Sequence, residues 1–169
     1  ESFAELSNNK ALITQTGVTD GEVMMALNNR IKPFNDIRVR QALALAIDKQ
    51  AIINTAMNGY GTPIGSHFSP ARSGYIDLNN IYPHDINRAK RLLADAGYKN
   101  GFSFTLQLPP PVYARRSGEV IAMQLAKIGI KVKIVQIEWS AWLDKVYGRH
   151  DFEATIISHA EPYDYTAYA

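Results

Sequence analysis

The stretch PFNDIRVRQALALAIDKQAI, residues 33–52, carries the clearest fold signal in the chain. Its apolar residues recur at intervals of three and four, which places them along one side of a helix. The members of this stripe are Val39, Ala42, Leu43, Ala46 and Ile47. Asn35 is predicted to cap the helix, with Asp36 in its first turn, and Asp48 is predicted to cap a second helix that reaches Met57. The stretch therefore predicts two successive helices, the first with a buried face.

Two short apolar runs precede this stretch. Residues 11–16 and residues 22–29 lie on either side of a turn signal at Gly17, Asp20 and Gly21. Apolar runs of this length bounded by Gly and Asp are typical of strands. We therefore expect two strands here, in an arrangement compatible with a hairpin.

The second half of the chain alternates between helical and strand patterns. A loop rich in Gly and Pro comes first, and a helix capped by Asp85 follows it. The further expected elements are a strand at 101–108, a helix at 113–128, a strand at 130–138, a short helix at 139–147 and a strand at 152–158. This alternation predicts an α/β domain, with helices packed on a mixed sheet whose later strands run largely parallel.

Composition excludes several classes of protein. The 169 residues suit a single domain, 1–169, and 46% apolar with 20% charged residues is typical of a globular chain. With 18 basic against 16 acidic residues and no run of like charge, nothing indicates binding to nucleic acid or to an anionic membrane surface. No apolar run approaches the ~20 residues of a membrane helix, so no stable membrane insertion is expected.

The sequence indicates no cofactor and no metal site. Cysteine is absent, and the four histidines show no spacing of metal ligands. The glycines of GYGTPIG, residues 59–65, follow a predicted helix instead of joining a strand to a helix, so they are typical of a turn and not of a dinucleotide loop. Neither a phosphate-binding Walker loop nor a nucleophile elbow occurs.

The segment SHAEPYDY, residues 158–165, is the candidate site. It directly follows a predicted parallel strand, and ligands of α/β sheets bind at that end of the strands. The candidate ligand-binding residues are Ser158, His159, Glu161, Tyr163 and Asp164. Three interpretations stay open: contact with a ligand, a polar loop that only caps the sheet, or acid/base catalysis by His159, Glu161 and Asp164.

Three blocks of the sequence resemble a known family. They are residues 33–52 with the following NGYGTPIGSHFSP, the run YPHDINRAKRLLADAGYKNGFSFTLQL at 82–108, and IAMQLAKIGIKVKIVQIEWSAWLDKVYGRHDFEATI at 121–156. In this order they resemble the peptide/nickel class, family 5, of bacterial extracellular solute-binding proteins. Such proteins capture dipeptides, oligopeptides, opines or nickel complexes for ABC importers.

The resemblance implies a two-lobed protein of the type II periplasmic-binding-protein kind, without enzymatic activity. This chain would be most of its C-terminal lobe, and the N-terminal lobe would lie outside the sequence. A peptide, opine or similar solute would bind between the lobes through hinge closure and pass to the permease subunits. The protein would be periplasmic, or extracellular and associated with the membrane. The first quoted helix would be scaffold, with Arg38 and Arg40 bracing local structure.

The resemblance also bears on the candidate site. In peptide binders the segment after the last strand commonly carries a Trp and an Asp that pairs with the peptide ammonium group. Here His159 lies near the position of that Trp, Glu161-Pro162 keeps an acidic-Pro pair, and that Asp has no evident counterpart. This departure implies a changed ligand class unless Glu161 or Asp164 takes over the role. The alternative function is a small-molecule enzyme that uses His159, Glu161 and Asp164.

Overall fold

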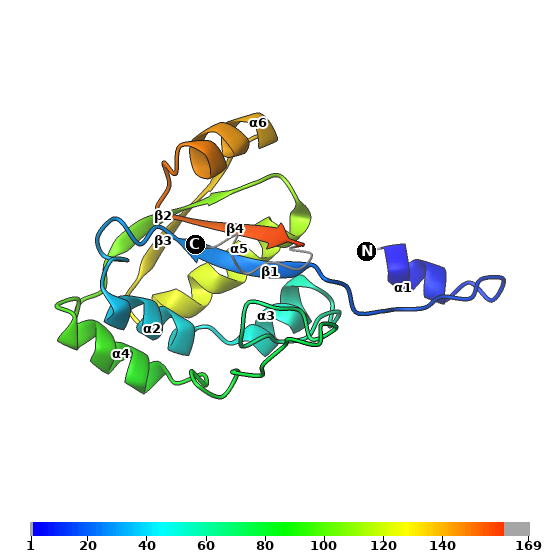
Figure 1. Ribbon diagram of the computed structural model, residues 1–169, viewed down its shortest axis with the longest axis horizontal. Helices are drawn as coiled ribbons and strands as arrows, with labels where there is room; N and C mark the ends of the chain where they lie inside the picture. Colours follow the sequence, from blue (N-terminus) through cyan, green and yellow to red (C-terminus); the bar gives the residue numbers. More distant parts are fainter. Residues whose placement is uncertain (1, 161–169) are drawn as a thin grey trace.

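The structure is a computed structural model that describes residues 2–160. Within this range four strands form one sheet in the order β1-β4-β2-β3 (Figure 1). β2 is parallel to both β3 and β4, whereas β1 is antiparallel to β4. The bounds are Glu22–Leu27 for β1, Ser103–Leu108 for β2, Lys131–Gln136 for β3 and Ala154–His159 for β4. The predicted mixed α/β sheet with parallel later strands is confirmed.

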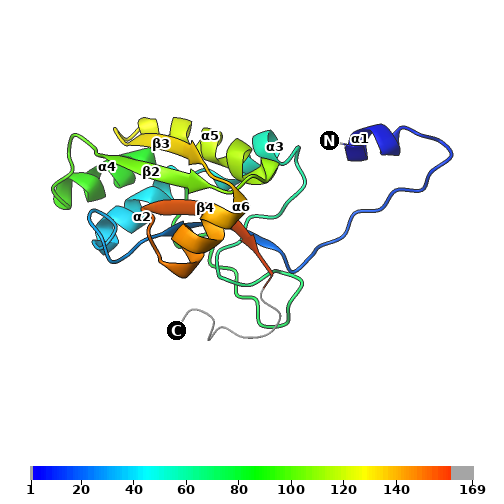
Figure 2. The same ribbon diagram turned by 90° about the horizontal axis from the view of Figure 1, so that it is seen from above.

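Helices lie on both faces of the sheet, and one face carries more of them than the other. In Figure 1, α2, α3 and α4 lie on one side of the strands and α6 lies on the other, and Figure 2 shows α5 along β2 and β3. The bounds are Ser2–Ser7 for α1, Ile37–Ala46 for α2, Lys49–Ala56 for α3, Ile86–Asp95 for α4, Val112–Ala126 for α5 and Trp139–Ala141 for α6. After α6 the chain continues directly as a π-helix, η1 (Trp142–Gly148). None of the helices within residues 2–160 combines the length and apolar character needed to cross a membrane.

Aspartate side chains begin three of the helices. Asp36, Asp48 and Asp85 accept hydrogen bonds from backbone amides in the first turns of α2, α3 and α4. Such caps satisfy amides that have no partner within the helix. The predicted caps at Asp48 and Asp85 are confirmed, but Asn35 is wrong as the first cap. Asp36 takes that position, because its carboxylate lies 2.8 Å from the amide nitrogen of Arg38.

The main core lies between the sheet and the helices α2, α4 and α5. On β2 the buried residues alternate with more exposed ones, so Phe104, Leu106 and Leu108 face the helices. The stripe predicted for α2 supplies Val39, Ala42, Leu43 and Ala46 to the same cluster, and Leu125 of α5 joins it. Leu106 and Leu125 are fully buried. This layer therefore buries most of the apolar surface that stabilises the domain.

One buried amide joins the α2–α3 junction to α5. The Oε1 atom of Gln124 accepts a hydrogen bond from the backbone amide of Asp48 at 2.9 Å, and its Nε2 atom donates to the carbonyl of the same residue at 3.3 Å. Gln124 is 6% exposed. Since both polar ends of the side chain are satisfied, its burial does not carry the cost of an unpaired polar group.

The opposite face of the sheet has a smaller cluster under η1. Trp142, Val146 and Ile157 are buried there, and the indole Nε1 of Trp142 donates to the hydroxyl of Thr155 at 3.0 Å. Two neighbouring side chains of this segment stay exposed, namely Trp139 in α6 and Leu143 in η1. The short helix predicted at 139–147 is present, but most of it is a π-helix.

The strand predicted at residues 11–16 is wrong within this structure. Residues 12–19 have no regular secondary structure, and the chain runs away from the sheet there toward α1 (Figures 1 and 2). β1 pairs with β4 instead of forming a hairpin with this segment. The apolar pattern of residues 11–16 thus has no partner strand within the described residues.

Candidate ligand-binding edge

The carboxyl ends of the parallel strands and the start of β1 meet at one edge of the sheet. β4 ends at His159, and its register places His159 opposite Glu22 and Ser158 opposite Val23. β2 runs in the same direction as β4, so its end at Leu108 points to this edge as well. Open α/β sheets bind ligands at the carboxyl ends of their parallel strands. We use the name ligand-binding edge for this candidate site, which consists of Glu22, His67, Tyr113, Ser158 and His159.

Tyr113 reaches this edge from the first turn of α5. The turn PPPVY leads from β2 into that helix, and the Tyr113 hydroxyl oxygen accepts a hydrogen bond from the backbone amide of Ser158 at 2.9 Å. The hydroxyl hydrogen remains available as a donor. Tyr113 therefore fixes the end of β4 and presents a polar group beside the candidate residues Ser158 and His159.

The long loop between α3 and α4 contributes His67 to the edge. Its course is fixed from the α3 side by Lys49, whose Nζ donates to the carbonyl of Ile64 at 2.6 Å and to Oδ1 of Asn79 at 3.2 Å. Burial lowers the pKa of the Lys49 ammonium group. Hydrogen bonds from the backbone amide and the side chain of Asn79 lower the pKa of Asp77. They outweigh burial, which acts in the opposite direction. The loop is thus held by polar contacts and not by regular secondary structure.

Three contacts join this loop to the segment that enters β1. Nδ1 of His67 lies 2.9 Å from Oε2 of Glu22, the guanidinium of Arg72 lies 2.8 Å from the Asp20 carboxylate, and the Ser69 hydroxyl donates to the carbonyl of Thr19 at 2.7 Å. We call these contacts the loop clamp. The Glu22 side chain is only 11% exposed, so its carboxylate is held against the loop.

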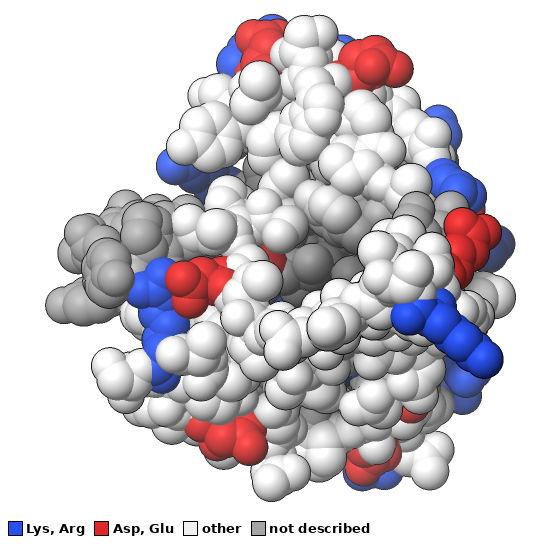
Figure 3. Space-filling view, turned by 90° about the vertical axis from the view of Figure 1, so that its right-hand side faces the viewer, with Lys and Arg blue, Asp and Glu red and all other residues white. Residues whose placement is uncertain are grey.

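Figure 3 views the molecule from the side to which β4 points. The surface is hollowed near its middle, and most residues around the hollow carry no charge. Lys, Arg, Asp and Glu lie mainly toward the periphery of this face. A concave surface with few charged groups is the kind of place at which proteins bind small molecules.

The structure describes two of the predicted site residues, Ser158 and His159, and both lie at this edge. Glu161, Tyr163 and Asp164 lie outside the described residues. Sequence reasoning did not single out Glu22, Tyr113 or His67 as candidate site residues. A usable signal existed for Tyr113, which follows a proline turn after an alternating strand.

Other candidate positions lie elsewhere in the fold. An open hollow of about 350 Å³ is lined by residues including Gln107, Lys145 and Glu153, near the start of β4 and away from the ligand-binding edge. His150 is exposed in the turn before β4. Among residues 2–160, no three His, Asp or Glu side chains are arranged to hold a metal ion.

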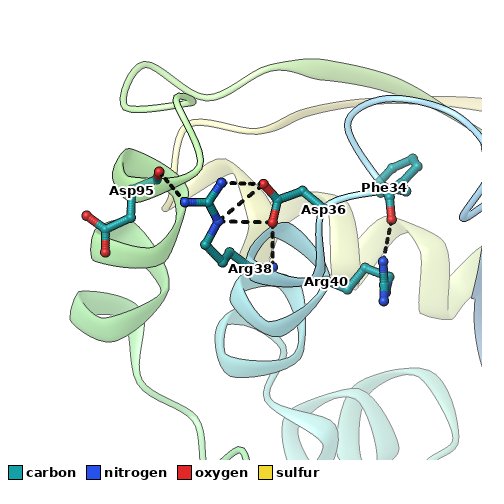
Figure 4. Close-up of polar contacts among 5 residues, drawn as sticks. All are labelled: Phe34, Asp36, Arg38, Arg40 and Asp95. Atoms are coloured by element: carbon teal, nitrogen blue, oxygen red, sulfur yellow. Dashed lines mark hydrogen bonds and ion pairs between the residues drawn. The ribbon is translucent and has the colours of Figure 1, made fainter.

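Arg38 and Arg40 brace the start of α2, as predicted (Figure 4). The Arg38 guanidinium contacts the Asp36 carboxylate at 2.6 Å and donates to the carbonyl of Asp95 in α4 at 2.7 Å. Arg40 donates to the carbonyl of Phe34 at 2.8 Å. The hydrogen bonds with Arg38 lower the pKa of Asp36, and the same pairing raises the pKa of Arg38. Both arginines therefore act in the scaffold.

Comparison with known protein families shows to which family the chain belongs. Residues 1–167 match the family described as bacterial extracellular solute-binding proteins, family 5 middle. The chain belongs to this family. The three sequence blocks and the mixed sheet are therefore family features, and the resemblance stated from the sequence is confirmed.

Individual relatives agree with this assignment. The chain is 38% identical to heme-binding protein A of Haemophilus influenzae over 134 residues, which are 76% of this chain and 24% of that protein. The PBP AgaA of A. tumefaciens R10 in complex with agropinic acid has a TM-score of 0.77 at 38% identity, over 83% of this chain and 29% of that one.

A dipeptide-binding protein of Pseudoalteromonas sp. SM9913, solved in complex with Met-Leu, has a TM-score of 0.85 at 28% identity. That match covers 94% of this chain and 32% of the other. The fold is thus shared with periplasmic binding proteins of type II. The chain spans 24% to 32% of the length of these relatives.

Proposed function

We propose that this chain is most of the C-terminal lobe of a solute-binding protein that serves an ABC importer. The ligand is a peptide or a peptide-like small solute such as an opine. The ligand-binding edge supports the proposal, because Tyr113, Ser158, His159 and Glu22 converge where the parallel strands of the sheet end. The family assignment supports the same function.

The mechanism is capture by closure of two lobes. A ligand shifts a two-state protein only by its difference in affinity for the two states, so it must contact both lobes in the closed form. The closed, loaded protein then meets the permease subunits in the periplasm or at the outer surface of the cell membrane. Residues of the ligand-binding edge supply the polar contacts of one lobe.

The enzyme alternative finds no support. The relatives are described as binding proteins, and one of them holds a dipeptide in its solved complex. Of the residues proposed for acid/base chemistry, Glu161 and Asp164 lie outside the described range. The contacts at the described part of the edge are hydrogen bonds, which suits binding.

The test is calorimetric titration of the two-lobed protein and of the 169-residue chain, with Met-Leu and agropinic acid as probes. We expect micromolar binding of one probe by the two-lobed protein. The single lobe should bind at least about 100-fold more weakly, since a micromolar ligand has about 8 kcal/mol of binding free energy and half of the contacts would be lost. Equal affinity of both proteins, or binding of neither probe by the two-lobed protein, would contradict the proposal.

A matched pair of histidine variants tests the edge itself. His159→Ala should weaken binding about tenfold or more, because it removes a polar group at the carboxyl end of β4. His150→Ala, in the exposed turn before β4, should leave the affinity unchanged. Equal effects of the two substitutions would place the ligand elsewhere.

A further inference from the structure

The loop between α3 and α4 is closed at its base, where residues 63–66 meet residues 76–79. We call these two short segments the loop neck. The Ser66 hydroxyl donates across the neck to the carbonyl of Ile76 at 2.7 Å. A Cβ atom on Gly65 would overlap with backbone atoms of the opposite side, so the two sides touch at a position that only glycine fits. A surface loop whose ends meet in this way is a compact unit.

Lys49 and Asn79 fasten the loop neck to α3. The side-chain amide of Asn79 donates to the carbonyl of Pro63 at 3.1 Å, and its Oδ1 atom accepts a hydrogen bond from Nζ of Lys49 at 3.2 Å. The same Nζ donates to the carbonyl of Ile64 at 2.6 Å. Lys49 is the first residue of α3, and α3 packs against α5. The neck therefore has a fixed position relative to the body of the domain.

The loop clamp holds the loop at a second place, beside the start of β1 (Figures 1 and 2). Between the two attachments the loop is bonded internally, because the amide of Arg72 donates to the carbonyl of Ser69 and the amide of Tyr75 donates to the carbonyl of Arg72. His67 directly follows the first side of the neck. The position of its side chain therefore depends on the neck.

We propose that Lys49 and Asn79 are positioning residues for ligand binding, which act through the loop neck and hold His67 against Glu22 at the ligand-binding edge. Their side chains contact the loop and α3, and neither belongs to the edge itself. Ordering a mobile group on binding costs free energy, so a His67 that is already in place gives tighter binding than a mobile one. The proposal rests on the proposed function, because it concerns the affinity of the same edge.

The first test is hydrogen–deuterium exchange of the two-lobed protein without ligand. Lys49→Met removes the donor to the neck and should speed exchange at the amides of Arg72 and Tyr75 by about tenfold or more, because the loop opens more easily. Lys49→Arg keeps a charged donor and should leave this exchange nearly unchanged. The amides of β2 should keep their protection in both variants. Unchanged exchange at Arg72 and Tyr75 in Lys49→Met would overturn the proposal.

A variant of the partner side chain separates the contact from the charge. Asn79→Ala removes the acceptor of Lys49 and the donor to Pro63 without a change in net charge. It should speed exchange at the same two amides as Lys49→Met does. It also keeps the proposal open to refutation if Lys49→Met does not fold, since unchanged exchange in Asn79→Ala would overturn it equally.

The second test is a double-mutant cycle in the two-lobed protein, titrated with Met-Leu and with agropinic acid. Lys49→Met and His67→Ala should each weaken binding about tenfold. The double variant should bind no more weakly than His67→Ala alone, because Lys49 acts through His67. Lys99→Met, at an exposed lysine in the turn before β2, should leave the affinity unchanged.

The outcomes of the cycle separate the two proposals. Additive losses would overturn the positioning role, because Lys49 would then affect binding without His67. An unchanged affinity in His67→Ala would overturn it as well. Binding of neither probe would contradict the proposed function, whereas the exchange measurements, which use no ligand, would still decide whether Lys49 and Asn79 hold the loop.

Discussion

The two faces of the sheet are covered to very different degrees. On one face, α2, α4 and α5 enclose a continuous core that includes Phe104, Leu106 and Leu108. On the other face, η1 covers only a small cluster around Trp142, and Trp139 and Leu143 remain exposed. A hydrophobic core stabilises in proportion to the apolar area that it removes from water. The difference indicates that the stability of the domain comes mainly from the first face.

The largest effect is expected from the first face. Leu106→Ala removes a fully buried side chain from the centre of β2 and should lower the free energy of unfolding by about 2–5 kcal/mol. Urea denaturation of the 169-residue chain measures this change. The control is Leu143→Ala on η1, where the side chain is 53% exposed, and its cost should stay below about 0.5 kcal/mol. Similar losses of unfolding free energy for the two leucine substitutions would show that the two faces do not differ in their contribution to stability.

A smaller effect is expected on the second face. Trp142→Phe keeps an aromatic ring but removes the indole donor, which leaves the buried Thr155 hydroxyl without this partner. The expected loss is about 1–3 kcal/mol, measured in the same denaturation experiment. Trp139→Phe, at a tryptophan that is 42% exposed, serves as the matched control and should be nearly neutral. A Trp142→Phe loss as large as that of Leu106→Ala would mean that the small cluster matters as much as the main core.

The smallest effect concerns pH and the partly exposed Asp36–Arg38 pair. Because pairing lowers the pKa of Asp36 below the ordinary value of 3.8, the folded state favours the carboxylate more than the unfolded state does. This stabilisation is complete above the ordinary pKa and is lost as the pH falls through the lowered one. Asp36→Asn can still cap α2 and should reduce the acid sensitivity of thermal unfolding between pH 6 and pH 2. An unchanged pH profile in this variant would show that the pair contributes nothing measurable.

Much of the fold could be predicted because its signals are local. The stripe of Val39, Ala42 and Leu43 defines a helix face, and the aspartates at 48 and 85 mark helix starts through contacts within three residues. The strand β2 shows its alternation directly in the sequence. Such patterns depend on neighbouring residues only.

The errors have a common physical cause, which is dependence on distant partners. Residues 11–16 have strand-forming side chains, but a strand needs a second strand to satisfy its backbone groups. The shift from Asn35 to Asp36 as the cap of α2 is supported by Arg38, which binds both Asp36 and the end of α4. A sequence pattern does not show which of two adjacent cap residues gains such a contact.

The site was predictable only in part for the same reason. Ser158 and His159 could be predicted because they lie at the carboxyl end of a parallel strand, of which they are the last two residues. Glu22 and His67 are separated by 45 positions, and they meet only because β1 pairs with β4 and the long loop folds back over its start. Contacts between residues so far apart in the chain do not produce a periodic sequence pattern.

The two hydrogen bonds between the Gln124 side chain and the backbone of Asp48 limit which residues can replace Gln124. A glutamate there would set a carboxylate against the Asp48 carbonyl, and a lysine could not accept the hydrogen bond from the Asp48 amide. Methionine has nearly the right size but would leave both backbone groups without this partner. The position is thus restricted by its need for a donor and an acceptor on one side chain, while many core positions around it are restricted mainly by volume. In a randomised library of this domain, mutational tolerance at residue 124 would follow polarity and not size.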